Sequence, residues 1–512
     1  MPRIARIFTN HAKLGRTPNM RHPQILSVPT TPDSCKRVQF VANQNDEFME
    51  KTLLWEAFAS LTAAEARDFG KFVRSPFFNA RQQPIVLFDY LDGCRRSGRL
   101  PKDSEAAVVI NKTEGGIKAR QANTALLALL EKYLAYSEKF QDEGRAKIRL
   151  AAAYRKRNLG KHFNITLREA RQNREQQPWR HADYFHDLNL VEWERYQFDT
   201  LTLRTEVFNL QATSDLMDTA FIVRKLQLAC AAVSHQTVYK AEYQIGLLNE
   251  VLAFVESANL IETPAVGLYY HCYKFQVDLQ EAGQHFERFR TILATHSEAF
   301  PPDELRALYL LAINFGIKKI NQSAEGWLRA TLDLYQSALS RKLLLENGQI
   351  SRFAFNNIIA IALRIGELDW VERFILEHKN LLERQWREAT ASLGLARVAY
   401  ARRDFKTALL NLQRSDYKDL INNLTAKTLQ LKIFYESGEF DLLENHLKGM
   451  KNYIKRHTSI GYHRTNYGLI VSYTQQLMSL DFRKKEAVEA LRAAIVGEEI
   501  LTEKEWFLGV LG

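Results

Sequence analysis

Glycine and proline are scarce in this chain, with 23 and 12 residues among 512. Average usage would give about 36 glycines and 26 prolines in this length. Strands and hairpins use both residue types in their turns, so the shortage favours long helices joined by short connections. With 46% apolar residues the chain can also bury an extensive core. We therefore expect an all-α protein.

Long apolar runs are also absent. A helix that spans a bilayer needs about 20 apolar residues. The longest candidate, residues 307–317, is interrupted by Asn314 and flanked by Arg306 and Lys318. This pattern indicates a buried helix and no membrane span. The first residues lack the charged and apolar regions of a secretory signal.

Cysteines are few and scattered. No two of them form a C-x-x-C pair, and no spacing suggests a zinc site. Isolated cysteines suit a reducing compartment, where a thiol behaves as a small core residue, so we expect a cytoplasmic protein. The four cysteines are Cys35, Cys94, Cys230 and Cys272.

Known catalytic motifs are missing as well. The sequence has no G-x-G-x-x-G, G-x-x-x-x-G-K-[ST], G-x-S-x-G or H-E-x-x-H pattern. His181 and His186 are five positions apart, which places their rings on different faces of a helix. His271 and Cys272 form an isolated pair that we interpret as core. We predict a protein that is not an enzyme and holds no metal or cofactor.

Residues 1–46 differ from the rest of the chain. They contain five of the twelve prolines and carry a net charge of +5 out of +11 overall. No helical period runs through them, so we expect a disordered basic tail. One alternative is that the start was assigned too far upstream, because Met49 opens the first well-patterned helix. The other alternative is a cleaved organellar presequence. Residues 47–512 thus carry a net charge of +6, which does not by itself indicate a nucleic-acid partner.

A Ser-Pro pair divides two apolar segments at residues 69–88. Thr62 and Glu65 have the spacing of a capping box, which predicts the start of a helix. Ser75 precedes a proline, so that helix should end near Arg74. We expect the next helix to start at residues 83–84, although Asn79 and Gln82 also resemble a capping box. Phe77 and Phe78 should then fill the corner between the two helices.

A family resemblance is carried by the stretch LTAAEARDFGKFVRSPFFNARQQPIVLFDYL, residues 61–91. It resembles the N-terminal signature of an uncharacterised group of helical proteins from Bacteroidetes-type bacteria. The resemblance covers about 45 residues from Met49. It supports Met49 as a start and implies no activity.

Short turns recur in the C-terminal half. Residues 366–368, 403–405 and 438–440 follow each other at 37 and 35 residues, close to the 34-residue tetratricopeptide unit. This half resembles degenerate tetratricopeptide repeats, which implies a right-handed superhelix or solenoid of helical hairpins. We predict a tail (1–46), an N-terminal helical module (47–112), a helical-hairpin array (117–345) and tetratricopeptide-like repeats (346–512) closed by capping helices at 463–480, 482–496 and 503–510.

A cluster of basic residues lies between positions 145 and 180. This stretch contains eleven Lys and Arg residues and only two acidic residues, and aromatic residues lie between them. The predicted hairpin is therefore a candidate for binding nucleic acid. An acidic protein partner is an alternative. Residues 183–206 carry a net charge of −4, so the two segments could also simply neutralise each other. The candidate basic patch consists of Arg155, Lys156, Arg157, Lys161, Arg168, Arg171 and Arg174.

A second candidate site follows from the repeats. Counted from the turns, a cation and a tyrosine recur on the concave side of successive units, and this pattern suits an acidic segment or a C-terminal carboxylate. The tyrosines could instead pack between repeats. We predict a non-catalytic scaffold that binds a protein or peptide, with a nucleic-acid-associated regulator as the alternative. The candidate groove residues are Asn356, Arg364, Arg397, Tyr400, Lys432 and Tyr435.

Overall fold

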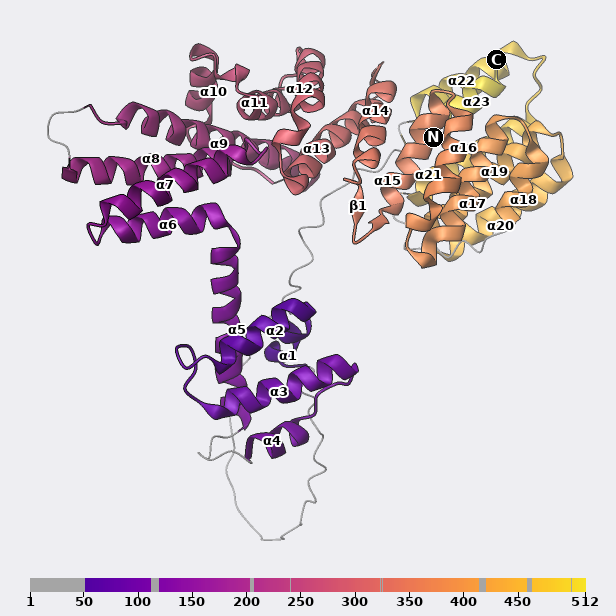
Figure 1. Cartoon of the computed structure of the whole chain (residues 1–512). Coiled ribbons are helices and arrows are strands. Elements are labelled where there is room, and N and C mark those ends of the chain that lie inside the picture. Colours follow the sequence, from indigo (N-terminus) through magenta and orange to yellow (C-terminus); the bar gives the residue numbers. More distant parts are fainter. Residues whose placement is uncertain are drawn as a thin grey trace, which may run out of the picture. The chain divides into compact units, whose positions relative to one another are not determined.

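The structure, a computed structural model, describes nine stretches of the chain (Figure 1). Within them the protein is all-α, with 23 α-helices and one hairpin of two-residue strands. The predicted tail, Met49 and the predicted boundary near 112–117 lie outside the described residues. The described stretches are 51–111, 119–202, 207–239, 241–322, 324, 326–413, 420–457, 463–498 and 500–512.

The described chain divides into two compact units. The N-terminal unit extends to residue 177 and also includes residues 184–217, whereas the C-terminal unit contains residues 178–183 and 218–512. The helices up to the division are α1 (Leu53–Ala59), α2 (Ala63–Arg74), α3 (Gln82–Ser97), α4 (Asp103–Asn111), α5 (Ala119–Gln141), α6 (Glu143–Arg155), α7 (Gly160–Gln176) and α8 (Ala182–Thr202).

The predicted corner in the N-terminal unit is confirmed in part. Thr62 and Glu65 form the reciprocal capping box, and α2 ends at Arg74. Asn79 does not cap α3; its side chain instead bonds the backbone of residues 73 and 81 and fastens the loop. Phe78 stacks on Phe72 with ring centroids 3.9 Å apart. Phe77 was wrongly placed in the corner, because its side chain points to solvent and is 86% exposed.

Helices α1 to α5 enclose one aromatic core. Phe88 of α3 meets Phe58 of α1 and Phe69 of α2 edge-on, with ring centroids 5.7 and 5.6 Å apart. Tyr133 of α5 closes the cluster against Phe69. Edge-to-face rings add about 0.5–1.5 kcal/mol each to the burial of their apolar surface. This module is therefore held by packing between helices that include pairs not adjacent in sequence, such as α1 with α3 and α2 with α5.

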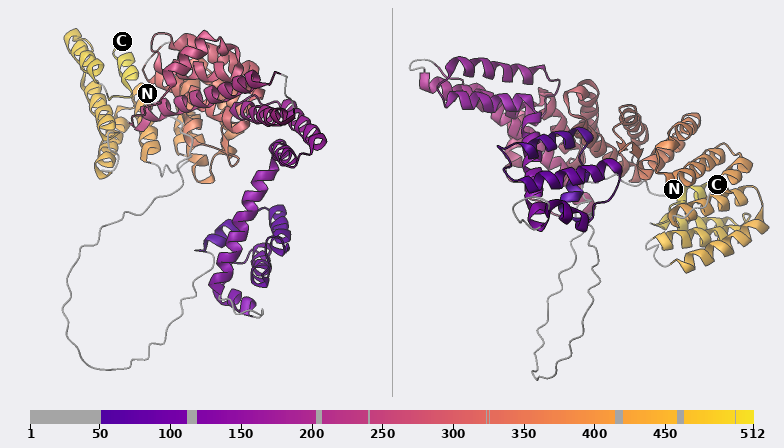
Figure 2. Two further views of the ribbon diagram at one scale, coloured as in Figure 1. Left: turned by 90° about the vertical axis from the view of Figure 1, so that its left-hand side faces the viewer. Right: turned by 60° about the horizontal axis from the view of Figure 1, so that its bottom comes forward.

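The C-terminal unit is a succession of helical hairpins. Helices that follow each other pack in pairs, as α11 does against α12, α13 against α14, α17 against α18 and α19 against α20, and Figure 2 shows α14 to α20 (orange to yellow) side by side. This sequential packing is consistent with a helical-repeat array. The helices are α9 (Leu210–Tyr239, which crosses the division), α10 (Leu248–Ser257), α11 (Pro264–Val277), α12 (Ala282–His296), α13 (Pro302–Asn321), α14 (Trp327–Ser340), α15 (Arg352–Arg364), α16 (Leu368–His378), α17 (Arg384–Ala401), α18 (Phe405–Gln413), α19 (Leu420–Glu436), α20 (Phe440–Arg456), α21 (His463–Ser479), α22 (Lys485–Gly497) and α23 (Lys504–Val510).

A β-hairpin of two short strands joins α14 to α15. Strands β1 (Leu345–Glu346) and β2 (Gln349–Ile350) pair antiparallel. Asn347 and Gly348 connect them, and both have positive φ angles, 50° and 76°. An Asn-Gly pair in this conformation is the favoured two-residue turn of a β-hairpin.

The three predicted turns are confirmed and share one geometry. Gly366, Arg403 and Gly438 each have a left-handed backbone, with φ of 80°, 60° and 75°. In each turn the next amide donates to a carbonyl five residues earlier, which is the Schellman closure of a helix C-terminus. These bonds are Glu367 N to Ala362 O, Asp404 N to Ala399 O and Glu439 N to Phe434 O, at 3.0, 2.9 and 2.9 Å.

Small and apolar side chains fill the space between these hairpins. Ala396, Ala408 and Leu412 lie in one core cluster between α17, α18 and α19, and Leu443 and Leu447 lie in the next. None of the described helices has a stretch long and apolar enough to cross a bilayer.

Candidate functional site

The six predicted groove residues lie on the first helices of three successive hairpins. Their side chains are all partly buried. Asn356 and Arg364 are on α15, Arg397 and Tyr400 on α17, and Lys432 and Tyr435 on α19.

A distant segment of the same chain contacts three of these side chains directly, those of Arg364, Lys432 and Tyr435. The Nζ atom of Lys432 lies 3.0 Å from Oε2 of Glu503, just before α23. Only 14% of the Lys432 side chain and 11% of the Glu503 side chain are exposed. The Lys432 ammonium also lies 5.1 Å from the centre of the Tyr400 ring and 5.6 Å from that of Trp506. It is thus bound by one carboxylate and two aromatic faces.

Glu436, one turn after Lys432 on α19, completes the cluster. Its Oε1 atom accepts a hydrogen bond from the indole nitrogen of Trp506 at 2.8 Å, and another from the hydroxyl of Tyr400. Burial, followed by this carboxylate, raises the pKa of Tyr400, so the hydroxyl stays protonated and donates. Tyr435 meets the Trp506 ring edge-on at 5.6 Å. The indole is therefore fixed by a polar bond and by ring contacts.

The remaining groove residues contribute less. The Arg364 guanidinium lies 3.8 Å from the Glu505 carboxylate, whose side chain is 69% exposed; such a pair contributes about 0–1 kcal/mol. Burial lowers the pKa of Arg397, and the negative charge of Glu503 partly offsets that effect. Among the described residues, Asn356 has no contact with residues 500–512. The sequence predicted a capping helix at 503–510 but not that its start contacts this face.

The basic patch is divided between ion pairs and exposed cations. Arg155 bonds Glu194 at 2.8 Å and Arg171 bonds Glu192 at 2.5 Å, both on α8. Arg174 lies 3.3 Å from Asp187, also on α8, and pairs with Asp142. These three cations therefore fasten α6 and α7 to the acidic helix. The other four, Lys156, Arg157, Lys161 and Arg168, are exposed.

The aromatic residues near the patch are not all available to a base. Phe163 is fully buried and stacks on Phe198 with centroids 4.3 Å apart. Tyr154 is half-buried beside the His162 ring, 5.2 Å away. Phe163 is therefore not available to stack on a base, because its ring belongs to the core of α6, α7 and α8.

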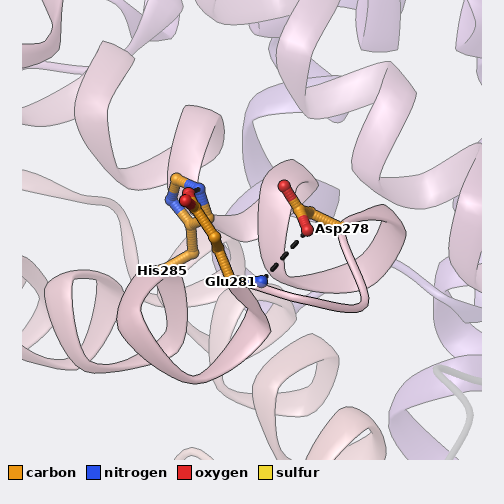
Figure 3. Close-up of side chains that lie close together, drawn as sticks. All are labelled: Asp278, Glu281 and His285. Carbon is orange, nitrogen blue, oxygen red and sulfur yellow. Dashed lines mark hydrogen bonds and ion pairs between the residues drawn. The ribbon is translucent and has the colours of Figure 1, made fainter.

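A cluster that the sequence did not reveal lies at the turn between α11 and α12 (Figure 3). Ligand atoms of Asp278, Glu281 and His285 lie within 4.8 Å of one another and could together hold a cation. Local contacts already account for them. Asp278 accepts from the amides of Gln280 and Glu281, both at 3.0 Å, and closes the turn. His285 lies 3.7 Å from the Glu281 carboxylate.

The predicted core pair His271 and Cys272 is confirmed as buried. The structure adds a partner, because Nδ1 of His271 lies 2.8 Å from Nδ1 of His285. Burial, then the charges of His285 and Arg288, lowers the pKa of His271 to about 4. Both rings are hence neutral at pH 7, and one donates to the other.

Comparisons of the chain with protein-family models, with curated proteins and with solved structures gave no match.

Proposed function

We propose that this protein is a non-catalytic helical-repeat scaffold that binds an acidic segment of another protein on the face of α15, α17 and α19. The observation that carries the proposal is the contact of Arg364, Lys432 and Tyr435 with an acidic, aromatic segment of the chain itself, beside the Tyr400 ring that packs against Lys432. Three successive hairpins thus supply side chains to one complementary surface.

The chemistry of this face favours acidic partners. A charge-assisted hydrogen bond between partly buried groups contributes about 1.5–3 kcal/mol. The aromatic rings around Lys432 add a cation–π term of about 0.5–2 kcal/mol. A basic segment would instead meet the ammonium and guanidinium groups of Arg364, Arg397 and Lys432 and be repelled.

The proposal includes a finer description of the fold. Helices α15 to α20 form degenerate tetratricopeptide-like units in a right-handed superhelix. The equal turns, their spacing of 37 and 35 residues and the small buried residues Ala396 and Ala408 support it. A cytoplasmic location is part of the same proposal. It is supported by Cys94, Cys230 and Cys272, which are free and buried.

The proposed function is tested by affinity purification of the full chain at low and moderate salt, with and without nuclease, read by mass spectrometry. We expect a defined protein partner that survives nuclease. An Arg364→Glu and Lys432→Glu double variant should lose it. A Lys451→Glu variant should retain the partner, because Lys451 is an exposed residue of α20 and lies outside this face. Equal recovery by all three proteins would contradict the proposal.

The alternative function is regulation through nucleic acid bound by α6 and α7. The exposure of Lys156, Arg157, Lys161 and Arg168 favours it. Binding driven by phosphates should weaken steeply with salt, with a slope of about 0.7–0.9 per contact. Lys156→Glu, Arg157→Glu and Lys161→Glu should abolish a mobility shift, whereas Arg155 is left unchanged because it pairs with Glu194. No shift with RNA or DNA at low salt would exclude this function.

A further inference from the structure

The face of α17 and α19 is already in contact with residues 500–512, which we call the cis segment. Glu503 and Trp506 make these contacts and lie three positions apart, so both project from one side of a helical turn. Glu503 contacts Lys432. Trp506 donates to Glu436 and meets the Tyr435 ring. The face therefore distinguishes a carboxylate position from an indole position.

The cis segment has a second, apolar side. Leu501, Phe507 and Leu511 are buried in a cluster formed with α19, α20, α21 and α22, and the amide of Thr502 donates to Asn466 at 2.8 Å. The contacts that Glu503 and Trp506 make with α19 are charged, polar and aromatic. The apolar side anchors the segment, whereas the polar side meets the face that we propose for partners.

The helical part of this segment is short. Helix α23 has seven residues, and an isolated helix shorter than about 12 residues is marginal in water. Its conformation therefore depends on the surfaces that it touches. Glu505, on the same turn, is mostly exposed and only loosely paired with Arg364. Loss of the Glu503 and Trp506 contacts would remove the ion pair and the indole contacts that hold this turn on α19.

We propose that the cis segment is an intramolecular ligand that competes with partners, and that a partner presents the same pattern, a carboxylate followed three positions later by tryptophan in a helical turn. This inference rests on the proposed function and deepens it, because it names the partner's chemistry and the device that limits access. A tethered ligand has an effective concentration on the order of millimolar. A partner segment consequently binds weakly while the cis segment is in place.

The test uses the full chain and a fluorescein-labelled peptide with the sequence of residues 500–512, ILTEKEWFLGVLG. Fluorescence anisotropy compares the wild-type chain with a Glu503→Gln, Trp506→Ala double variant. We expect the double variant to bind the peptide at least about tenfold more tightly, because the tethered competitor is weakened. A peptide with the same two replacements is the control and should not bind.

Two further variants locate the binding. Lys432→Glu added to the double variant should abolish peptide binding, and Lys451→Glu should leave it unchanged. Equal affinity of the wild-type chain and the double variant, or equal affinity for both peptides, would overturn the inference. Single Glu503→Gln is nearly isosteric and serves as the test if the double variant does not fold; it should give a smaller gain in the same direction.

The two proposals fail differently. Peptide binding that behaves as expected, without any protein partner in the affinity purification, would overturn the proposed function and the partner's pattern, but would leave the cis segment as an intramolecular ligand of this face. A partner that depends on Arg364 and Lys432 but is captured equally by the wild-type chain and the Glu503→Gln, Trp506→Ala variant would overturn the intramolecular ligand alone.

Discussion

The ammonium of Lys432 lies 3.0 Å from the carboxylate of Glu503, although 71 residues separate them in sequence. Their contact brings the start of α23 against α19, on the side where Tyr400 and Trp506 also lie. The chain thus places an acidic segment of its own on the face for which its sequence pattern predicts an acidic ligand. The following predictions test this relationship and the packing that supports it.

Glu503→Gln should loosen the cis segment. The loss of one charge-assisted bond between partly buried groups costs about 2 kcal/mol, which lowers amide protection roughly 30-fold. Hydrogen exchange of residues 500–512 measures it. Glu505→Gln is the matched control, because its exposed pair with Arg364 contributes under about 1 kcal/mol. Equal exchange in the two variants would show that the Lys432 contact does not hold the segment.

Asp187→Ala should destabilise the N-terminal unit. Only 1% of the Asp187 side chain is exposed, and it lies between Arg145 and Arg174. Removing this carboxylate leaves the charge of the buried Arg174 guanidinium less well neutralised, which lowers the free energy of unfolding by about 3 kcal/mol. Limited proteolysis within α6 to α8 should accelerate. Glu175→Ala removes a half-exposed pair with Arg171 and should change little; comparable acceleration by both variants would contradict the account.

Gly267→Ala should destabilise the C-terminal unit. A methyl group on Gly267 would lie 2.3 Å from the carbonyl oxygen of Ile261, so the backbone has to shift, at a cost of about 1–3 kcal/mol. Gly449→Ala is the control in the interior of α20, where nothing lies within 4 Å. That change should stabilise by up to about 1 kcal/mol. Thermal melting followed by circular dichroism should therefore shift in opposite directions, and shifts of the same sign would contradict this packing.

Acidification should open the α11–α12 hairpin. The pKa of His271 is lowered to about 4, first by burial and then by His285 and Arg288, whereas the unfolded chain binds the proton near its ordinary value of 6.5. The unfolded state therefore takes up more protons between these values, and stability falls as the pH falls from 6.5 to 4. Hydrogen exchange of α11 and α12 across this range measures the fall.

The control for this pH dependence is His271→Gln, which keeps a polar side chain beside His285 but cannot take up the proton. It should make the pH dependence of exchange in α11 and α12 shallower. An unchanged dependence would assign the effect to other groups, among them His285, whose pKa is also lowered by burial and by Lys274.

Features encoded over a few residues were predictable from the sequence. The capping box of Thr62 and Glu65 and the turns at Gly366, Arg403 and Gly438 depend on bonds within five positions. Local backbone preferences fix such bonds, so the pattern alone identifies them. The all-α class followed instead from the composition of the whole chain, because its few glycines and prolines favour long helices joined by short connections.

Contacts between distant residues were not predictable. The pairing of His271 with His285 depends on how the two helices of one hairpin pack, and the ion pair of Lys432 with Glu503 depends on how distant helices come together. Phe77 and Phe78 are adjacent and equally apolar, but Phe78 stacks on Phe72, whereas Phe77 meets the Phe78 ring edge-on and is 86% exposed. In the basic patch, charge counts could not tell Arg174, which is buried beside Asp187, from exposed Lys161. Tertiary geometry decides each case.

The most direct test of the account is a photo-crosslink from the face itself. Tyr435 of the full chain is replaced by benzoylphenylalanine, and the crosslinked peptides are identified by mass spectrometry after irradiation in cells. The account predicts crosslinks to residues 503–506 of the chain. It also predicts crosslinks to a segment of another protein with a carboxylate three positions before a tryptophan, enriched by Glu503→Gln and Trp506→Ala. Crosslinks to the chain's own segment alone, in the wild type and in that variant alike, would contradict it.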